Sequence, residues 1–104
     1  MNRRIIVQPE AAEDAKGIFT YLAKNSFSVA RRFNEAAADT LLQIQADPSN
    51  SIRWMSPKTR LQDLRWKKVR GFKRYLIFFR ATDDCVEVVR ILDGSRDVET
   101  LLAN

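Results

Sequence analysis

The sequence predicts an α+β fold in which an N-terminal helical hairpin packs on a small, mainly antiparallel sheet and a short helix ends the chain. Three observations predict it. The chain has 104 residues and is 45% hydrophobic, which suits one domain, 1–104, with its own core. Apolar residues repeat at helical spacing through the first half. Three strand-forming runs, separated by short turns, follow in the second half.

The first half predicts a strand and two helices. RIIVQ, residues 4–8, is short and β-branched, and Pro9 both ends it and suits the first position of a helix. A break at 25–28 and a stop at 47–50 delimit a second helix from about 29 to 46. Because that break is short, we expect the helices to be antiparallel. Their core-facing residues are Ala11, Ala15, Ile18 and Leu22, then Ala30, Phe33, Ala37, Leu41 and Ile44.

The second half predicts a loop, three strands and a final helix. We expect a connecting loop over 49–61, strands over 64–69, 74–81 and 86–92, and a short helix capped by Ser95. The middle strand is apolar without alternation over Tyr75–Phe79. A strand that is apolar on both faces has one face on the helices and the other covered by something else.

Positive charge is concentrated between residues 53 and 80. This segment contains one acid, Asp63, and ten of the 18 Lys and Arg residues: Arg53, Lys58, Arg60, Arg65, Lys67, Lys68, Arg70, Lys73, Arg74 and Arg80. Such segregation predicts a polyanionic partner, either nucleic acid or an acidic protein segment. Trp54 and Trp66 lie among these cations; they either stack on bases or, the reading we favour, anchor the loop and the sheet.

The chain lacks residue types that several kinds of catalysis and metal binding require. The chain has no histidine, which removes the usual general base and the commonest metal ligand. Its one cysteine, Cys85, cannot form an internal disulfide, which fits a reducing cytoplasm. No apolar run approaches the length of a membrane span, and the basic start reaches acids too early for a signal peptide. Glu10, Glu13 and Asp14 share one helical turn, but the helix dipole and solvation account for them better than a metal site does. We expect no metal, no cofactor and no membrane association.

An arginine cluster is the remaining catalytic possibility. By strand parity Arg74 and Arg80 share one face of the middle strand, and Arg90 lies across from them. Glu87 or Tyr75 would then transfer protons, but their ordinary pKa values, near ~4.3 and ~10, are poorly matched to neutral pH. The alternative is that the arginines pair with Glu87 or Asp93, and we favour binding over catalysis.

Four stretches together resemble the RelE/ParE toxin superfamily of type II toxin–antitoxin modules. They are PEAAEDAKGIFTYLAKN, ARRFNEAAADTLLQIQADPS, LQDLRWKKVRGFKRYLIFFR and VEVVRILDGSRD, which cover most of the chain in the family's order. The ending GSRDVETLLAN, without a tyrosine or histidine, is more similar to ParE than to the ribonuclease RelE. Asp93 stands where the family usually has histidine.

The resemblance implies a ParE-like toxin that inhibits DNA gyrase and is neutralised by a cognate antitoxin, ParD-like or related, through an acidic C-terminal segment. That segment would also cover the second apolar face of the middle strand. Nucleic acid is the second-best partner. The antitoxin-binding residues that the resemblance implies are Ile18, Leu22, Phe33, Arg65, Trp66, Lys68, Lys73, Arg74, Tyr75, Ile77 and Phe79. The implied target-binding residues are Arg90, Arg96, Asp97, Leu101 and Leu102.

Two alternatives stay open. One is a RelE-like mRNA interferase, a ribonuclease that would use Arg74, Glu87, Arg90 and Arg96. The other is a degenerate toxin that retains only antitoxin binding.

Overall fold

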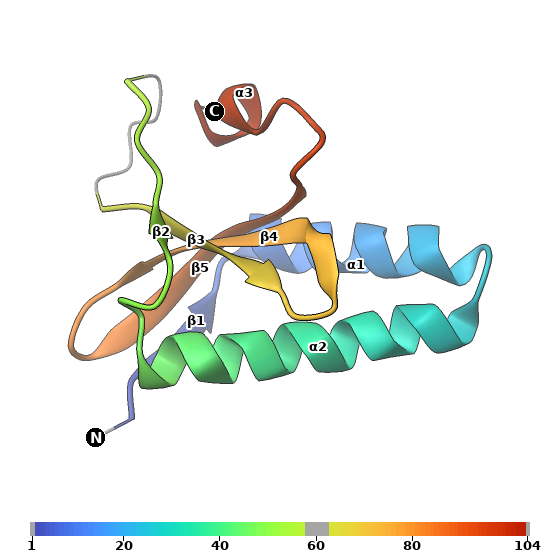
Figure 1. Ribbon diagram of the computed structural model, residues 1–104, viewed down its shortest axis with the longest axis horizontal. Helices are drawn as coiled ribbons and strands as arrows, with labels where there is room; N and C mark the ends of the chain where they lie inside the picture. Colours follow the sequence, from blue (N-terminus) through green and yellow to red (C-terminus); the bar gives the residue numbers. More distant parts are fainter. Residues whose placement is uncertain (1, 58–62, 104) are drawn as a thin grey trace.

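The element order agrees with the prediction. The structure, a computed structural model, describes residues 2–57 and 63–103 (Figure 1). Its elements are β1 (Arg4–Val7), α1 (Pro9–Ala23), α2 (Phe27–Ala46), β2 (Ile52–Arg53), β3 (Arg65–Val69), β4 (Phe72–Ala81), β5 (Cys85–Asp93) and α3 (Val98–Ala103). The α+β class, the N-terminal helical pair and the short terminal helix are confirmed.

One mixed sheet holds all five strands in the order β1-β5-β4-β3-β2. β3, β4 and β5 form the predicted antiparallel meander, while β1 lies parallel to β5, with Ile5 beside Val86. β2 is a correction: part of the expected loop is a two-residue strand in which Ile52 pairs with Trp66. So short a strand has no periodicity for a sequence to reveal. Residues 58–61 of that loop lie outside the described residues.

The helical hairpin covers one face of the sheet (Figure 1). Pro9 occupies the start of α1, and the Ser26 hydroxyl accepts a 3.2 Å hydrogen bond from the Val29 amide at the start of α2. That bond satisfies one of the amides left open at a helix N-terminus. No helix within residues 2–57 or 63–103 is long and apolar enough to span a membrane.

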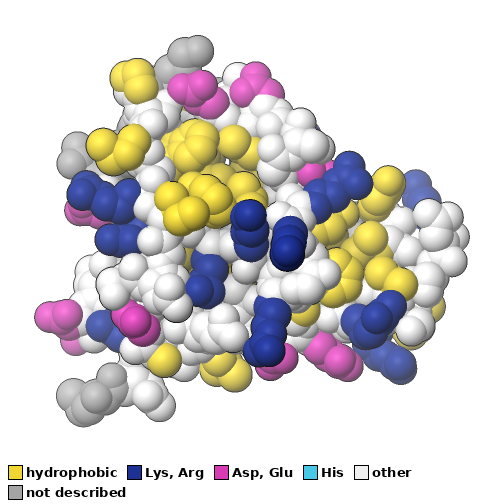
Figure 2. All heavy atoms as spheres, in the orientation of Figure 1, with side chains coloured by type: hydrophobic (Ala, Val, Ile, Leu, Met, Phe, Trp, Pro, Cys, Tyr) yellow, Lys and Arg dark blue, Asp and Glu magenta, His cyan; other side chains and the backbone are white. Residues whose placement is uncertain are grey.

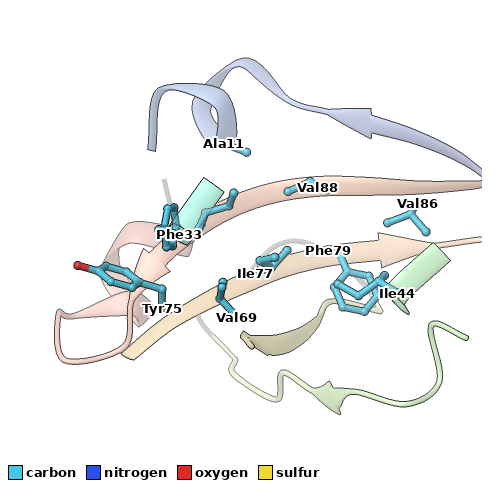
Figure 3. Packing of buried hydrophobic residues seen from close by; sticks show 10 residues of the cluster. Ala11, Phe33, Ile44, Val69, Tyr75, Ile77, Phe79, Val86 and Val88 are labelled. Atoms are coloured by element: carbon cyan, nitrogen blue, oxygen red, sulfur yellow. The ribbon is translucent and has the colours of Figure 1, made fainter. Parts of the chain in front are cut away.

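Between the hairpin and the sheet lies the helix-side core (Figure 3). Phe33 of α2 is fully buried and packs edge-on against Phe72 and Tyr75, with ring centroids 5.5 and 5.2 Å away. The buried members of this core are Ala11, Phe33, Ile44, Val69, Tyr75, Ile77, Phe79, Val86, Val88 and Ile91. One face of the middle strand therefore packs on the helices, as expected.

A second core on the opposite face settles what covers the other side of the middle strand. Its buried members are Leu64, Phe78, Leu92 and Leu102, flanked by Trp54, Trp66, Leu76, Val89, Val98 and Leu101. The chain's own α3 and the Trp54 and Leu64 segments supply the cover that we had reserved for a partner. Trp54 packs edge-on against Phe78 at 5.7 Å, so both tryptophans serve the fold.

The start of α3 also differs from the prediction. The Asp97 carboxylate, not Ser95, accepts a 3.3 Å bond from the Thr100 amide. Ser95 instead donates to Asp93 from its amide (2.9 Å) and its hydroxyl (2.8 Å). Both residues are good helix caps, and only the path of the turn decides which of them lies in place.

Candidate partner-binding site

A cleft of about 570 Å³ lies between α1 and the turn that follows β5. One wall is α1, and the floor and far rim come from β4, β5 and the turn. The lining residues are Glu13, Asp14, Gly17, Ile18, Tyr21, Arg74, Tyr75, Ile91, Asp93, Ser95 and Arg96. The cleft thus joins an apolar and aromatic interior to a polar rim, which is typical of binding sites.

Arg74 and Asp93 form an ion pair on the rim, with 2.8 Å between Arg74 Nε and Asp93 Oδ2. Burial raises the pKa of Asp93, but bonds from the Ser95 amide and hydroxyl and from Arg74 outweigh it and leave that pKa lowered. The same hydrogen bond raises the pKa of Arg74. Asp93 therefore accepts the hydrogen bonds that hold the turn and forms an ion pair with Arg74.

Arg96 stands at the same rim with an exposed side chain. Its backbone is fixed, because its amide donates to the Asp93 carbonyl (3.0 Å) and its carbonyl accepts from the Val98 amide (2.8 Å). Its guanidinium makes no hydrogen bond or ion pair with any residue of 2–57 or 63–103. A rigidly based, unpaired cation next to α3 is suited to contact an external anion.

Arg90, by contrast, is committed inside the molecule. Its Nε and Nη2 donate to the Asp14 carboxylate at 2.7 and 2.9 Å, and the Ile91 amide donates to the same carboxylate at 3.0 Å. Arg90 Nη1 also reaches the Leu101 carbonyl at 3.5 Å. The Asp14 carboxylate thereby accepts from a backbone amide of β5 that lies beyond the end of β1. The expected target contact of Arg90 is replaced by an internal link from α1 to β5 and α3.

Asp14 is the functional residue that sequence reasoning missed. We explained it by the helix dipole and solvation, yet its carboxylate is largely covered and joins residues 76 and 77 positions away. No local signal could have found this partner, because the pairing depends on where α1 crosses the sheet.

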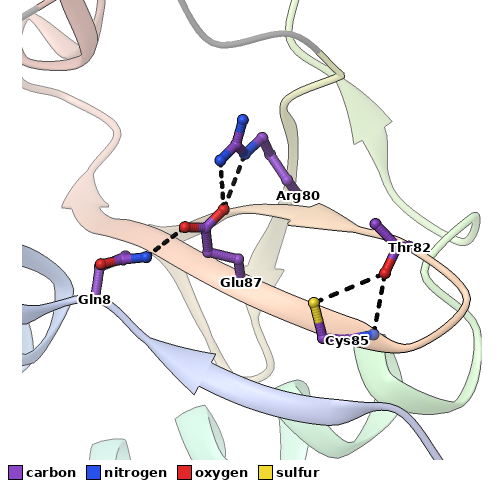
Figure 4. Close-up of polar contacts among 5 residues, drawn as sticks. All are labelled: Gln8, Arg80, Thr82, Cys85 and Glu87. Carbon is purple, nitrogen blue, oxygen red and sulfur yellow. Dashed lines mark hydrogen bonds and ion pairs between the residues drawn. The ribbon is translucent and has the colours of Figure 1, made fainter.

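The Glu87 carboxylate is also engaged in hydrogen bonds inside the molecule (Figure 4). It accepts bonds from Arg80 Nε (3.0 Å) and Nη2 (2.6 Å), and from the side-chain amide of Gln8. The predicted pairing of the arginines with Glu87 and Asp93 is confirmed for Arg80 and Arg74. Three of the four residues of the ribonuclease alternative, Arg74, Glu87 and Arg90, are thus held in three separate ion pairs.

The expected antitoxin residues fall into three groups, of which the first two are the buried residues and those at or near the cleft. Phe33, Ile77 and Phe79 are fully buried in the helix-side core, so a partner cannot reach them and we withdraw their assignment. Ile18, Arg74 and Tyr75 line the cleft, Lys73 is exposed near its β4 side, and Leu22 packs partly buried on the helix-side core. Among the expected target residues, Leu102 is the buried residue of α3 and Leu101 is half-buried, while Asp97 is exposed.

The remaining expected antitoxin residues lie at the other edge of the sheet. A groove of about 470 Å³ is lined by Asn50, Ser51, Ile52, Trp66, Lys67, Lys68 and Arg70. Arg65 Nη1 donates to the Ser51 carbonyl (3.2 Å), and Lys67 Nζ donates to the Asn50 carbonyl (2.8 Å). These two cations therefore brace the segment after α2, while Lys68 remains exposed.

The fold and the cleft define a small, basic α+β protein whose accessible groups are suited to binding. Residues 5–98 match the family model of the ParE toxin of type II toxin–antitoxin systems, parDE, and the chain belongs to this family. A solved structure described as a chromosomal ParDE toxin–antitoxin system from P. aeruginosa has a similar fold, with a TM-score of 0.66 and 14% identity over 86% of this chain and 92% of that one. No curated protein matches the sequence.

Proposed function

We propose that this chain is the toxin of a type II toxin–antitoxin module and that it inhibits DNA gyrase by binding. The observation that carries the proposal is the contrast among the arginines of the cleft region. Arg74 and Arg90 are tied to Asp93 and Asp14, whereas Arg96, beside α3, presents a free guanidinium. Membership of the ParE family supports gyrase as the target.

A cognate antitoxin would neutralise the toxin in the cytoplasm. The net charge of +5 and the cations around the cleft favour an acidic antitoxin segment. Ile18 and Tyr21 on α1 would receive its apolar side chains, and Arg74 and Arg96 its carboxylates. Because Arg96 is also our proposed target contact, the antitoxin would cover the residue that gyrase needs.

Purified toxin tests the proposal. It should inhibit supercoiling by gyrase or trap gyrase-cleaved DNA, and the isolated antitoxin should reverse the effect. Unimpaired gyrase at saturating toxin would rule out gyrase as the target and favour the degenerate-toxin alternative if growth is also unaffected.

The ribonuclease alternative keeps one supporting observation, since Arg74, Tyr75 and Arg96 line the same cleft. However, burial raises the pKa of Tyr75 above its ordinary value of 10.0, so its hydroxyl keeps its proton at neutral pH. It is therefore a poor general base. Mapping of transcript ends after induction separates the two functions: a ribonuclease gives new codon-specific ends, and a gyrase inhibitor gives none.

A further inference from the structure

The end of the β3–β4 hairpin carries three exposed cations, Lys68, Arg70 and Lys73, which we call the basic hairpin end. They lie within six residues, on either side of the turn at Gly71, where φ is +79°. Figure 2 shows Lys and Arg side chains gathered in the middle of the sheet-bearing face, between two areas of hydrophobic side chains. None of the three side chains lines the cleft.

The basic hairpin end has no internal counter-charge. Arg74, Arg80 and Arg90 each pair with a carboxylate. Lys68, Arg70 and Lys73 pair with none in residues 2–57 and 63–103. The adjoining groove is lined by polar, apolar and basic residues and by no acid. Three unneutralised like charges on one hairpin repel one another, and an anionic partner would relieve that repulsion.

The backbone of the basic hairpin end is held in place by the fold. The Arg70 amide donates to the buried Thr40 hydroxyl of α2 at 3.1 Å, and Val69 is fully buried. Phe72 packs edge-on against Phe33. The backbone under the cations is therefore fixed before any partner arrives, so binding orders little besides the long side chains.

The surroundings favour nucleic acid over an acidic protein. The case for a protein cover rested on the second apolar face of β4, and α3 with Leu102 already covers that face. Trp66 lines the adjoining groove but is partly buried in the second core, so its ring is not a free platform for bases. The three cations of the hairpin end offer a ligand positive charge without base readout, which suits phosphates.

We propose that the basic hairpin end binds the phosphate backbone of duplex DNA, without sequence readout. This inference rests on these side chains and goes beyond the proposed toxin function. It would hold the protein on the kind of duplex that gyrase itself binds, but DNA binding can be measured with no gyrase or antitoxin present.

The test measures binding of purified protein to a labelled mixed-sequence duplex by fluorescence anisotropy, from about 50 to about 200 mM salt. We expect wild-type affinity to fall steeply with salt. The triple variant Lys68→Gln/Arg70→Gln/Lys73→Gln should bind more weakly, and its slope of log K against log salt should be smaller by about 2 to 3, near 0.9 per lost phosphate contact.

A matched variant removes the same charge from the helical hairpin. Lys16→Gln/Lys24→Gln/Arg31→Gln changes three exposed cations on α1, just after it and on α2, and should leave the salt slope close to that of the wild type. Both variants should melt like the wild type, since none of the six side chains is buried.

Three results would overturn the proposal. They are no binding of the duplex by the wild type at low salt, an equal loss in both variants, or tighter binding of a polyglutamate peptide than of the duplex at the same salt. The last result would identify the hairpin end as an acidic-protein surface instead.

Discussion

The two faces of the sheet are covered in very different ways. The helix-side face lies under two helices of 15 and 20 residues and contributes most of a ten-residue buried core. The opposite face lies under α3, six residues long, and segments around Trp54 and Leu64, with four buried residues. The helical hairpin therefore supplies most of the core and one wall of the cleft, whereas the thinly covered face holds α3 next to Arg96.

The contacts of α3 support this division. Leu102 is its one buried residue, and among the contacts of the described residues Glu99 accepts from Ser56 Oγ at 2.5 Å and the Leu101 carbonyl lies 3.5 Å from Arg90 Nη1. A short segment anchored by one buried residue has a low free energy of local opening. We therefore expect the amides of α3 to exchange with solvent well before those of α2.

The largest effect should come from the helix-side core. Phe33→Ala removes a fully buried ring that packs on two aromatic neighbours, and should lower the free energy of unfolding by about 3–5 kcal/mol. Urea denaturation followed by circular dichroism measures it. A loss below about 1 kcal/mol would mean that the hairpin is not the main source of stability.

Asp14→Asn should come next. The variant keeps the shape of the side chain but leaves the Arg90 guanidinium, which is largely covered, without its anion. We expect a loss of about 2–3 kcal/mol. Its neighbour gives the control: Glu13→Gln breaks an exposed pair with Lys16 at 3.9 Å and should change stability by less than about 0.5 kcal/mol. Equal effects would contradict the bridging role of Asp14.

A smaller and more local effect is expected on the opposite face. Leu102→Ala removes the buried anchor of α3 and should cost about 2 kcal/mol. Hydrogen exchange should show α3 losing protection while α2 keeps it. Uniform loss of protection across the molecule would show that both faces unfold as one unit and would remove the distinction drawn above.

The smallest effect concerns acid. Because the pKa of Asp93 is lowered in the folded protein, its ionised form stabilises the fold above its ordinary value of 3.8, and this contribution is lost as pH falls through the lower folded value. Asp93→Asn should therefore be less stable than the wild type near pH 7. The difference between their free energies of unfolding should shrink as pH falls through that acidic window. Asp83→Asn, in an exposed turn, should unfold like the wild type near pH 7.

The elements could be predicted from sequence because their signals are local. The stripe ending at Ile44 and the run Tyr75–Phe79 specify a helix and a strand buried on both faces. They do not specify what covers each face, so a partner was assigned to a surface that α3 occupies. The parallel pairing of β1 and the bond from Arg90 to Asp14 link distant residues, and only the assembled fold brings them together.

The candidate site was predicted in part. Arg74, Tyr75 and Arg96 line one cleft, whereas strand parity had grouped Arg74 with Arg80 and Arg90. Parity could not show that Arg90 pairs with Asp14, because that carboxylate lies on α1 and a β-bulge between Phe78 and Phe79 shifts the register of β4 against β5.

The most direct test of the central claim is Arg96→Ala in a gyrase supercoiling assay, with unfolding measured on the same preparation. The side chain is exposed and makes no hydrogen bond or ion pair with the described residues, so stability should change by less than about 0.5 kcal/mol. Inhibition of gyrase should be lost, while Arg4→Ala, an exposed arginine on β1, should inhibit like the wild type. Full inhibition by a folded Arg96→Ala protein would contradict the account.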